Sequence, residues 1–64
     1  MREVKLGQQW EIYSPKGRRW HRVVVTHIDG ELVTLRSADK QFHECLKSAL
    51  ADSNVYRFVS DAAS

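Results

Sequence analysis

Four cationic side chains surround a tryptophan in the segment between positions 16 and 22, and no other stretch is as well suited to binding a ligand. Lys16, Arg18, Arg19 and Arg22 fall within seven positions, and no acidic residue separates them. Lysine and arginine displace counterions from phosphates, and a ring such as that of Trp20 can stack on a base. The segment therefore predicts a surface for RNA or single-stranded DNA. The alternative is a solvated loop that only keeps the protein soluble.

A second kind of site would be lined by aromatic rings. Tyr13, Trp20 and Tyr56 are the rings that could form it. Such rings bind proline-rich peptides or alkylated cations. In so small a chain each of the three could equally be a structural residue.

Metal binding and catalysis find little support in the sequence. His21, His27, His43 and Cys45 are suitable ligand types, but their spacing is not the paired spacing that tetrahedral zinc favours. The chain has no glycine-rich phosphate loop and no nucleophile elbow. We expect no enzymatic activity, no cofactor and no metal.

Length and composition narrow the class of protein. With 64 residues the chain is expected to form one domain over residues 1–64, and a domain of this size buries only about 60% of the surface that its unfolded chain exposes. The lone Cys45 excludes an internal disulfide, which favours a reducing compartment. No stretch is long and apolar enough to span a membrane, so a cytoplasmic protein without membrane contact is expected. Residues 1–36 carry a net charge of +3 and residues 37–64 a net charge of −1, which places the basic character in the first part of the chain.

The elements that must position these residues centre on a hairpin between Arg19 and Arg36, folded at Asp29-Gly30. A regular ladder would bury Thr26 and expose Val25. One extra residue, accommodated as a bulge at Thr26 and His27, instead places five branched aliphatic side chains on one face. These are Val23, Val25, Ile28, Val33 and Leu35. We therefore predict the bulge.

The remaining elements are short. Residues 4–13 are predicted to form a first strand with a bend at Gly7 and with Trp10 in the core, followed by a type I turn over residues 14–17. Residues 37–40 form a turn. For residues 41–52 we favour a short strand over 41–44 followed by a helix over 45–51. The alternative is one amphipathic helix, because Phe42, Cys45, Leu46, Ala49 and Leu50 have helical spacing. Residues 55–59 form a last strand and residues 60–64 a frayed tail.

Four or five short strands with a brief helix before the last one predict a mainly β fold, a small closed barrel. The chain resembles the small SH3-like barrels, the group that contains Tudor and KOW modules. The resemblance rests on Leu6-Gly7-Gln8-Gln9-Trp10, on the hairpin of residues 23–35 and on Tyr56-Arg57-Phe58. More narrowly, the layout is similar to short uncharacterised bacterial proteins with Gly-x-x-Trp, a valine hairpin and a terminal Tyr-Arg-Phe.

The resemblance implies a fold more than an activity, because proteins of this group bind RNA, DNA, proline-rich peptides or methylated side chains. Its peptide-binding members usually carry an acidic loop after the first strand, whereas the loop here is basic. The sequence thus favours a non-enzymatic binding module that contacts RNA or single-stranded DNA through Lys16, Arg18, Arg19, Trp20 and Arg22. The alternative is a module for protein–protein interaction or assembly, and a monomer or weak homo-oligomer is expected.

Overall fold

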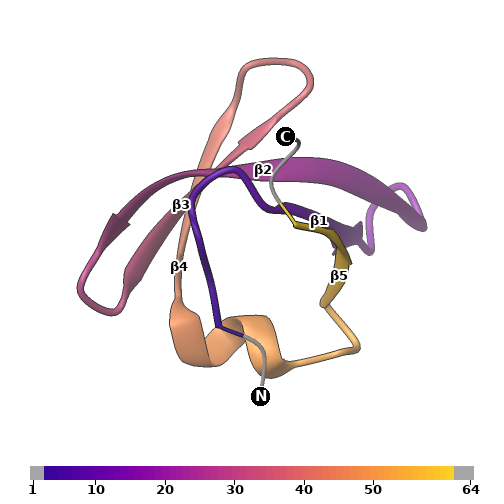
Figure 1. Cartoon of the computed structure of the whole chain (residues 1–64). Coiled ribbons are helices and arrows are strands. Elements are labelled where there is room, and N and C mark those ends of the chain that lie inside the picture. Colours follow the sequence, from indigo (N-terminus) through magenta and orange to yellow (C-terminus); the bar gives the residue numbers. More distant parts are fainter. Residues whose placement is uncertain (1–2, 62–64) are drawn as a thin grey trace.

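Five antiparallel strands form one curled sheet in the computed structural model, which describes residues 3–61 (Figure 1). The strands are β1 (Gln9–Ser14), β2 (Arg19–Asp29), β3 (Leu32–Ser37), β4 (Phe42–Leu46) and β5 (Tyr56–Ser60). Their order in the sheet is β4-β3-β2-β1-β5, and one short 3-10 helix, η1 (Lys47–Ala51), precedes the last strand. The predicted fold class is confirmed: the domain is mainly β, with a single helical turn before β5.

The predicted bulge is present in β2 at Thr26. Val25 lies opposite Leu35, and the next paired residue of β2 is His27, opposite Thr34. Thr26 is therefore the extra residue, and Ile28 pairs with Val33 on the same face as Val25. Val23, Val25, Val33 and Leu35 are at most 1% exposed, so the register that collects the aliphatic side chains is the one adopted.

The turn of this hairpin lies one residue later than predicted. Asp29 pairs with Leu32, so the two turn residues are Gly30 and Glu31 rather than Asp29 and Gly30. Gly30 has φ +61°, which glycine adopts without the steric penalty that a Cβ would bring. A glycine with positive φ at the first loop position suits a two-residue hairpin, and it leaves Asp29 free to extend the strand.

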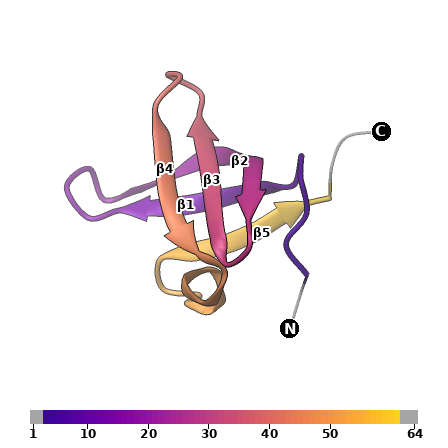
Figure 2. The same cartoon turned by 90° about the vertical axis from the view of Figure 1, so that its left-hand side faces the viewer.

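The core lies on the concave side of the sheet, where η1 covers it. Trp10 and Leu50 are each 5% exposed and join the four aliphatic residues of β2 and β3. The ring of Phe58 meets that of Trp10 edge-on, with centroids 5.5 Å apart. Trp10 is thus a core residue, as predicted, and Figure 2 shows η1 below the sheet, between β4 and β5.

The first strand is shorter than predicted, because the chain bends at Gly7 and Gln8. Gly7 has φ +84°, and its N–H donates to the Val25 carbonyl at 2.8 Å. The side chain of Gln8 is buried and holds the arm of residues 3–7 in place. Its Oε1 accepts from Lys5 N–H at 3.0 Å and from Trp10 Nε1 at 3.2 Å, and its Nε2 donates to the Glu3 carbonyl at 3.0 Å. One buried amide therefore fixes the arm, and β1 starts only at Gln9.

The segment of residues 41–52 follows the favoured version, a strand and then a helix, with a shifted boundary. Cys45 and Leu46 still belong to β4, and the helix is a 3-10 helix of five residues. The amphipathic stripe does not form a buried face, because Phe42 is 63% and Leu46 53% exposed. Only Leu50 of that set is buried, since in a strand Phe42 and Leu46 point away from the core while Cys45 points toward it.

Up to residue 61, the last one described, the end of the chain is more ordered than predicted. Ser60 belongs to β5, where it pairs with Gln9, and the Asp61 carboxylate accepts a hydrogen bond from Gln8 Nε2 at 3.3 Å. Residues 62–64 of the predicted tail lie outside the described residues.

The two edge strands, β4 and β5, are joined by side chains and not by a ladder in the described part of the chain. The Tyr56 hydroxyl on β5 and the Cys45 thiol on β4 are close enough to influence each other's pKa. On β4, the residues bonded to β3 are the odd-numbered ones, since Ser37 N–H donates to the Gln41 carbonyl and Lys47 N–H donates to the Glu31 carbonyl. The backbone groups of Phe42, Glu44 and Leu46 therefore point to the outer edge of the sheet.

The bulge predicts losses of stability of different size when two neighbouring valines are changed to alanine. Changing Val25→Ala should lower the free energy of unfolding by about 2 kcal/mol or more, because the side chain is fully buried. Val24→Ala should cost less than about 1 kcal/mol, because Val24 lies on the other face and is only half-buried. Urea titrations of both variants measure the difference. Equal losses would show that the bulge does not set the register.

Candidate nucleic-acid interface

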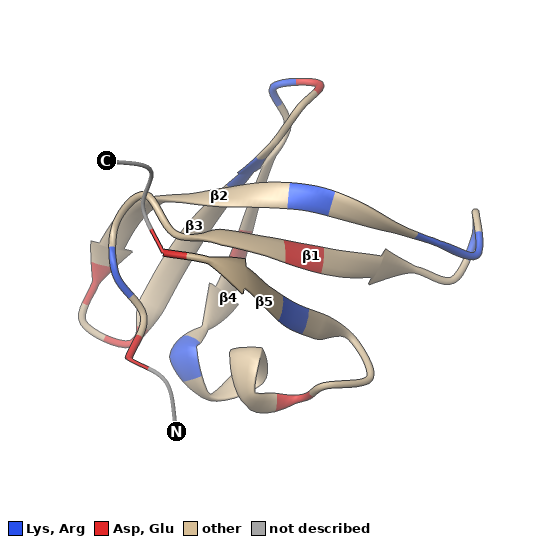
Figure 3. Cartoon of the chain, turned by 45° about the vertical axis from the view of Figure 1, so that its right-hand side comes forward, with Lys and Arg blue, Asp and Glu red and all other residues tan. Residues whose placement is uncertain are grey.

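The predicted basic cluster occupies the tip of the β1–β2 hairpin and the start of β2. Ser14 pairs with Arg19, and the loop between them spans residues 15–18. The left-handed position of this loop is Arg18, with φ +51°, and not Gly17. Lys16, Arg18 and Arg19 are exposed, and Figure 3 shows the tip projecting away from the rest of the molecule as a basic segment. The chain contains no acidic residue between positions 12 and 28, so the charge of the tip is not neutralised by its sequence neighbours.

Strand alternation distributes the predicted residues over two faces. Trp20 lies opposite Tyr13, and Arg22 lies opposite Glu11, all on the convex outer face of the sheet. Arg19 directly precedes Trp20 on β2. Because successive side chains of a strand point to opposite faces, Arg19 points to the other side of the hairpin from Trp20. The hairpin thus presents cations on both sides of its tip but only one aromatic platform, on the outer face.

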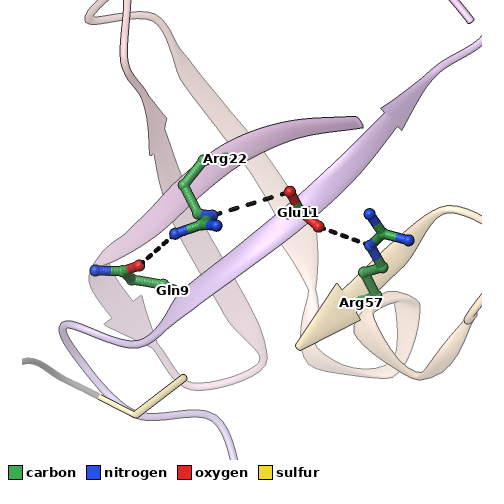
Figure 4. Close-up of polar contacts among 4 residues, drawn as sticks. All are labelled: Gln9, Glu11, Arg22 and Arg57. Carbon is green, nitrogen blue, oxygen red and sulfur yellow. Dashed lines mark hydrogen bonds and ion pairs between the residues drawn. The ribbon is translucent and has the colours of Figure 1, made fainter. Parts of the chain in front are cut away.

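A carboxylate lies between two arginines on this outer face, as Figure 4 shows. Arg57 Nε donates to Glu11 Oε1 at 2.7 Å, and Arg22 Nε lies 4.0 Å from Glu11 Oε2. Arg22 also donates from Nη1 to Gln9 Oε1 at 2.7 Å. The arginine side chains remain about half exposed, at 51% and 53%, so both can exchange the carboxylate for another anion.

Arg57 is a residue of this surface that the sequence analysis did not include. Its guanidinium carbon lies 4.2 Å from the centroid of the Trp20 ring, which is a cation–π contact. The Tyr13 ring meets Trp20 at 61° with centroids 5.4 Å apart. The alternation of β5 contained the signal: with Tyr56 and Phe58 facing the core, Arg57 between them must face outward. Which ring it would reach depended on the strand order, which no local pattern specifies.

The three aromatic residues proposed to share one site do not lie together. Tyr13 and Trp20 are in contact on the outer face. Tyr56 pairs with Ile12 on the opposite face, where it packs against the core and lies close to Cys45. The predicted ring-lined site is therefore reduced to the pair of Tyr13 and Trp20. On that face Arg57, rather than a third ring, packs against Trp20.

A shallow hollow extends this surface toward β3. It has a volume of about 280 Å³ and lies between Arg22 and Arg36, with Val24 and Thr26 beside them. Val24 pairs with Arg36 across the ladder, so the two guanidinium groups flank one apolar side chain. Room for a phosphate-sized group is thus available next to Arg22.

The potential metal ligands lie in separate parts of the sheet. His43 and Cys45 are two positions apart on β4 and share its concave face. His27 pairs with Thr34 beside the bulge. Within residues 3–61, no three histidine, cysteine, aspartate or glutamate side chains come together as a metal site. Partial burial raises the pKa of the Cys45 thiol above its ordinary value, and the Tyr56 hydroxyl offsets this only in part. A neutral thiol in this position behaves as a small apolar side chain.

Comparisons with known proteins give no relative for this chain: no family model, no curated protein and no solved structure matches it. Among the described residues, no helix has the length and apolar character needed to cross a membrane.

The Cys45–Tyr56 contact predicts a loss of stability at alkaline pH. Burial raises the pKa of both groups in the folded state above their ordinary values of 9.0 and 10.0. Because both folded pKa values are raised, the folded state keeps its protons to higher pH than the unfolded state does, and the stabilisation by the neutral forms is lost as pH rises above the ordinary values. The contribution of this pair to the free energy of unfolding should therefore be constant near neutrality and decline above pH 9.0.

Denaturant titrations at a series of pH values measure this decline. In Cys45→Ala the onset should move to higher pH, because only Tyr56 then titrates early. A thiol that ionises below its ordinary pKa, followed by absorbance at 240 nm, would contradict the assignment.

Proposed function

We propose that the protein is a non-enzymatic module that binds single-stranded nucleic acid on the outer face of β5, β1 and β2 and on the adjoining hairpin tip. The observation that carries the proposal is the stack of Arg57 on Trp20. It places an aromatic platform on the same face as Arg22 and next to the exposed tip that carries Lys16, Arg18 and Arg19.

The chemistry of each group decides which part of the nucleic acid it binds. The exposed cations of the tip meet phosphates and release counterions, which supplies affinity without sequence preference. A base stacks on Trp20 or on the guanidinium plane of Arg57, since both ring faces and arginine planes accept bases. Arg22, beside the hollow that reaches Arg36, holds a phosphate next to the stacked base.

Single strands suit this surface better than a duplex does. The Trp20 ring lies on the outer face of β2, where it offers a platform for stacking. Stacking also requires an unpaired base. RNA and DNA share the phosphate and base chemistry used here, so the proposal covers both, and oligonucleotides of each kind test it.

Removing cations at the tip should lower both the affinity and its salt dependence. With four phosphate contacts on a single strand, the slope of log K against log salt should be roughly −2.8. The triple variant Arg18→Gly, Arg19→Ala, Arg22→Ala removes three of the contacts and should bring the slope to about −0.7. Glycine is chosen at position 18 because of its positive φ. Fluorescence anisotropy with labelled oligouridylate and oligothymidylate measures binding at several salt concentrations.

A matched control removes three other cations. Lys5→Ala, Lys40→Gly, Lys47→Ala causes the same change in net charge and also places glycine at a left-handed position, since Lys40 has φ +65°. Its slope should equal that of the parent protein. A slope insensitive to the tip variant, or one lowered equally by both variants, would exclude the tip as the binding surface.

Glu11 should act as a competitor of the phosphates. Its carboxylate binds Arg57 and lies near Arg22, and bound phosphate must displace it. Glu11→Gln keeps an oxygen acceptor but removes the charge, so it should strengthen oligonucleotide binding about two- to fivefold, the range expected for an exposed ion pair. Glu44→Gln, an exposed glutamate on the outer face of β4, is the control for the change in net charge. Equal gains in both variants would show that Glu11 has no specific role.

A further inference from the structure

A second hollow lies at the other end of β2 from the basic tip. It has a volume of about 660 Å³, which is in the range of sites that hold small ligands or a few side chains. It opens between the N-terminal arm, the β2–β3 turn and η1. Figure 1 shows the arm running down to η1. The surface proposed to bind nucleic acid shares no residue with it.

The walls of the hollow are apolar and already fixed by the core. Trp10, Leu50 and Phe58 contribute to them, together with Val4 from the arm. The orientation of the Trp10 ring is fixed, since its Nε1 donates to the buried Gln8 side chain at 3.2 Å. The arm that carries Val4 is fixed by the same Gln8, which bonds to Glu3 and Lys5. An apolar side chain can therefore enter a preformed hollow without reorganising the fold.

The described residues of the rim carry net negative charge. Among them Glu3 and Glu31 are acidic and Lys47 is the one cation, which gives these residues a net charge of −1. The Lys47 N–H donates to the Glu31 carbonyl at 2.8 Å, so the rim is fixed where β4 meets η1. Asp61 lies close by, because its carboxylate accepts from Gln8 Nε2, the group that also binds the Glu3 carbonyl. In Figure 3 the acidic segments at this end of the molecule lie opposite the basic tip.

We propose that this hollow is the docking site for a segment of a partner protein in which a large apolar side chain is flanked by lysine or arginine. The apolar side chain gains burial against Trp10, Leu50 and Phe58, and the flanking cations meet Glu3 and Glu31. The same carboxylates repel phosphates, so this end does not continue the nucleic-acid surface.

Blocked tripeptides separate the two components of recognition. Acetyl-Lys-Phe-Lys-amide has both, acetyl-Glu-Phe-Glu-amide reverses the charge, and acetyl-Lys-Gly-Lys-amide lacks the apolar side chain. Each is titrated into the isotope-labelled full chain and followed through its amide resonances. The Lys-Phe-Lys peptide should shift the amides of Glu31, Lys47, Leu50 and Ala51, and the other two peptides should shift them much less at the same concentration.

Variants then assign the binding to the rim and to the hollow. The double variant Glu3→Gln, Glu31→Gln should bind the Lys-Phe-Lys peptide about tenfold more weakly, as two exposed ion pairs allow. The matched control Glu11→Gln, Glu44→Gln removes two other glutamates and should bind as the parent does. Ala51→Trp fills the opening from an exposed position and should abolish the shifts while the remaining resonances stay in place.

Several outcomes would overturn the proposal: equal binding of the acidic or the glycine peptide, shifts that map to another surface, insensitivity to the Glu3 and Glu31 changes, or no shifts at millimolar peptide. Because the tip variants of the nucleic-acid surface leave this end unchanged, Arg18→Gly, Arg19→Ala, Arg22→Ala should retain peptide binding. The two proposals can therefore fail separately.

Discussion

The insertion of one residue into β2 is the constraint on which the rest of the structure depends. Without the bulge at Thr26, either the valines before it or Ile28 after it would face solvent, and no register would bury both sets. With it, β2 contributes to the core along most of its length. A bulge also bends its strand and increases the local twist. The long β2 can therefore pair with β1 over its first half and with β3 over its second, and the sheet curls around one small core.

The parts of the fold that the sequence predicts are those in which each local pattern has one solution. The valine hairpin buries its aliphatic side chains in only one register, and Tyr56 and Phe58 flank an outward-facing Arg57. The errors arose where two local preferences compete. Gly30 serves the turn at either loop position, and the helical spacing of Phe42 to Leu50 is equally compatible with a strand followed by a short helix. The burial of Gln8 could not be predicted, because its partners at Glu3 and Asp61 are brought together only by the complete fold.

On the outer face, oppositely charged side chains from three strands lie next to one another. Glu11 lies between Arg22 and Arg57 and interacts with both, and Arg57 also lies over the Trp20 ring, so these groups are ordered without an external ligand. Such an arrangement limits the conformational freedom that binding would otherwise remove. The opposite end of β2 has the reverse character: there two carboxylates border an apolar hollow, and Lys47 is the one cation among the described lining residues. One strand thus separates two surfaces of opposite charge.

The edge strand β4 carries a charge that opposes one way of pairing two copies of the domain. Phe42 and Leu46 are exposed on the strand whose outer backbone groups are unpaired within the sheet, a combination that favours strand addition. If two copies paired antiparallel so that Phe42 met Leu46 of the other copy, Glu44 would lie directly opposite itself. Like charges in that position destabilise a strand pair. The Glu44 carboxylate at the centre of β4 therefore disfavours this alignment, in which the exposed side chains of Phe42 and Leu46 would cover each other.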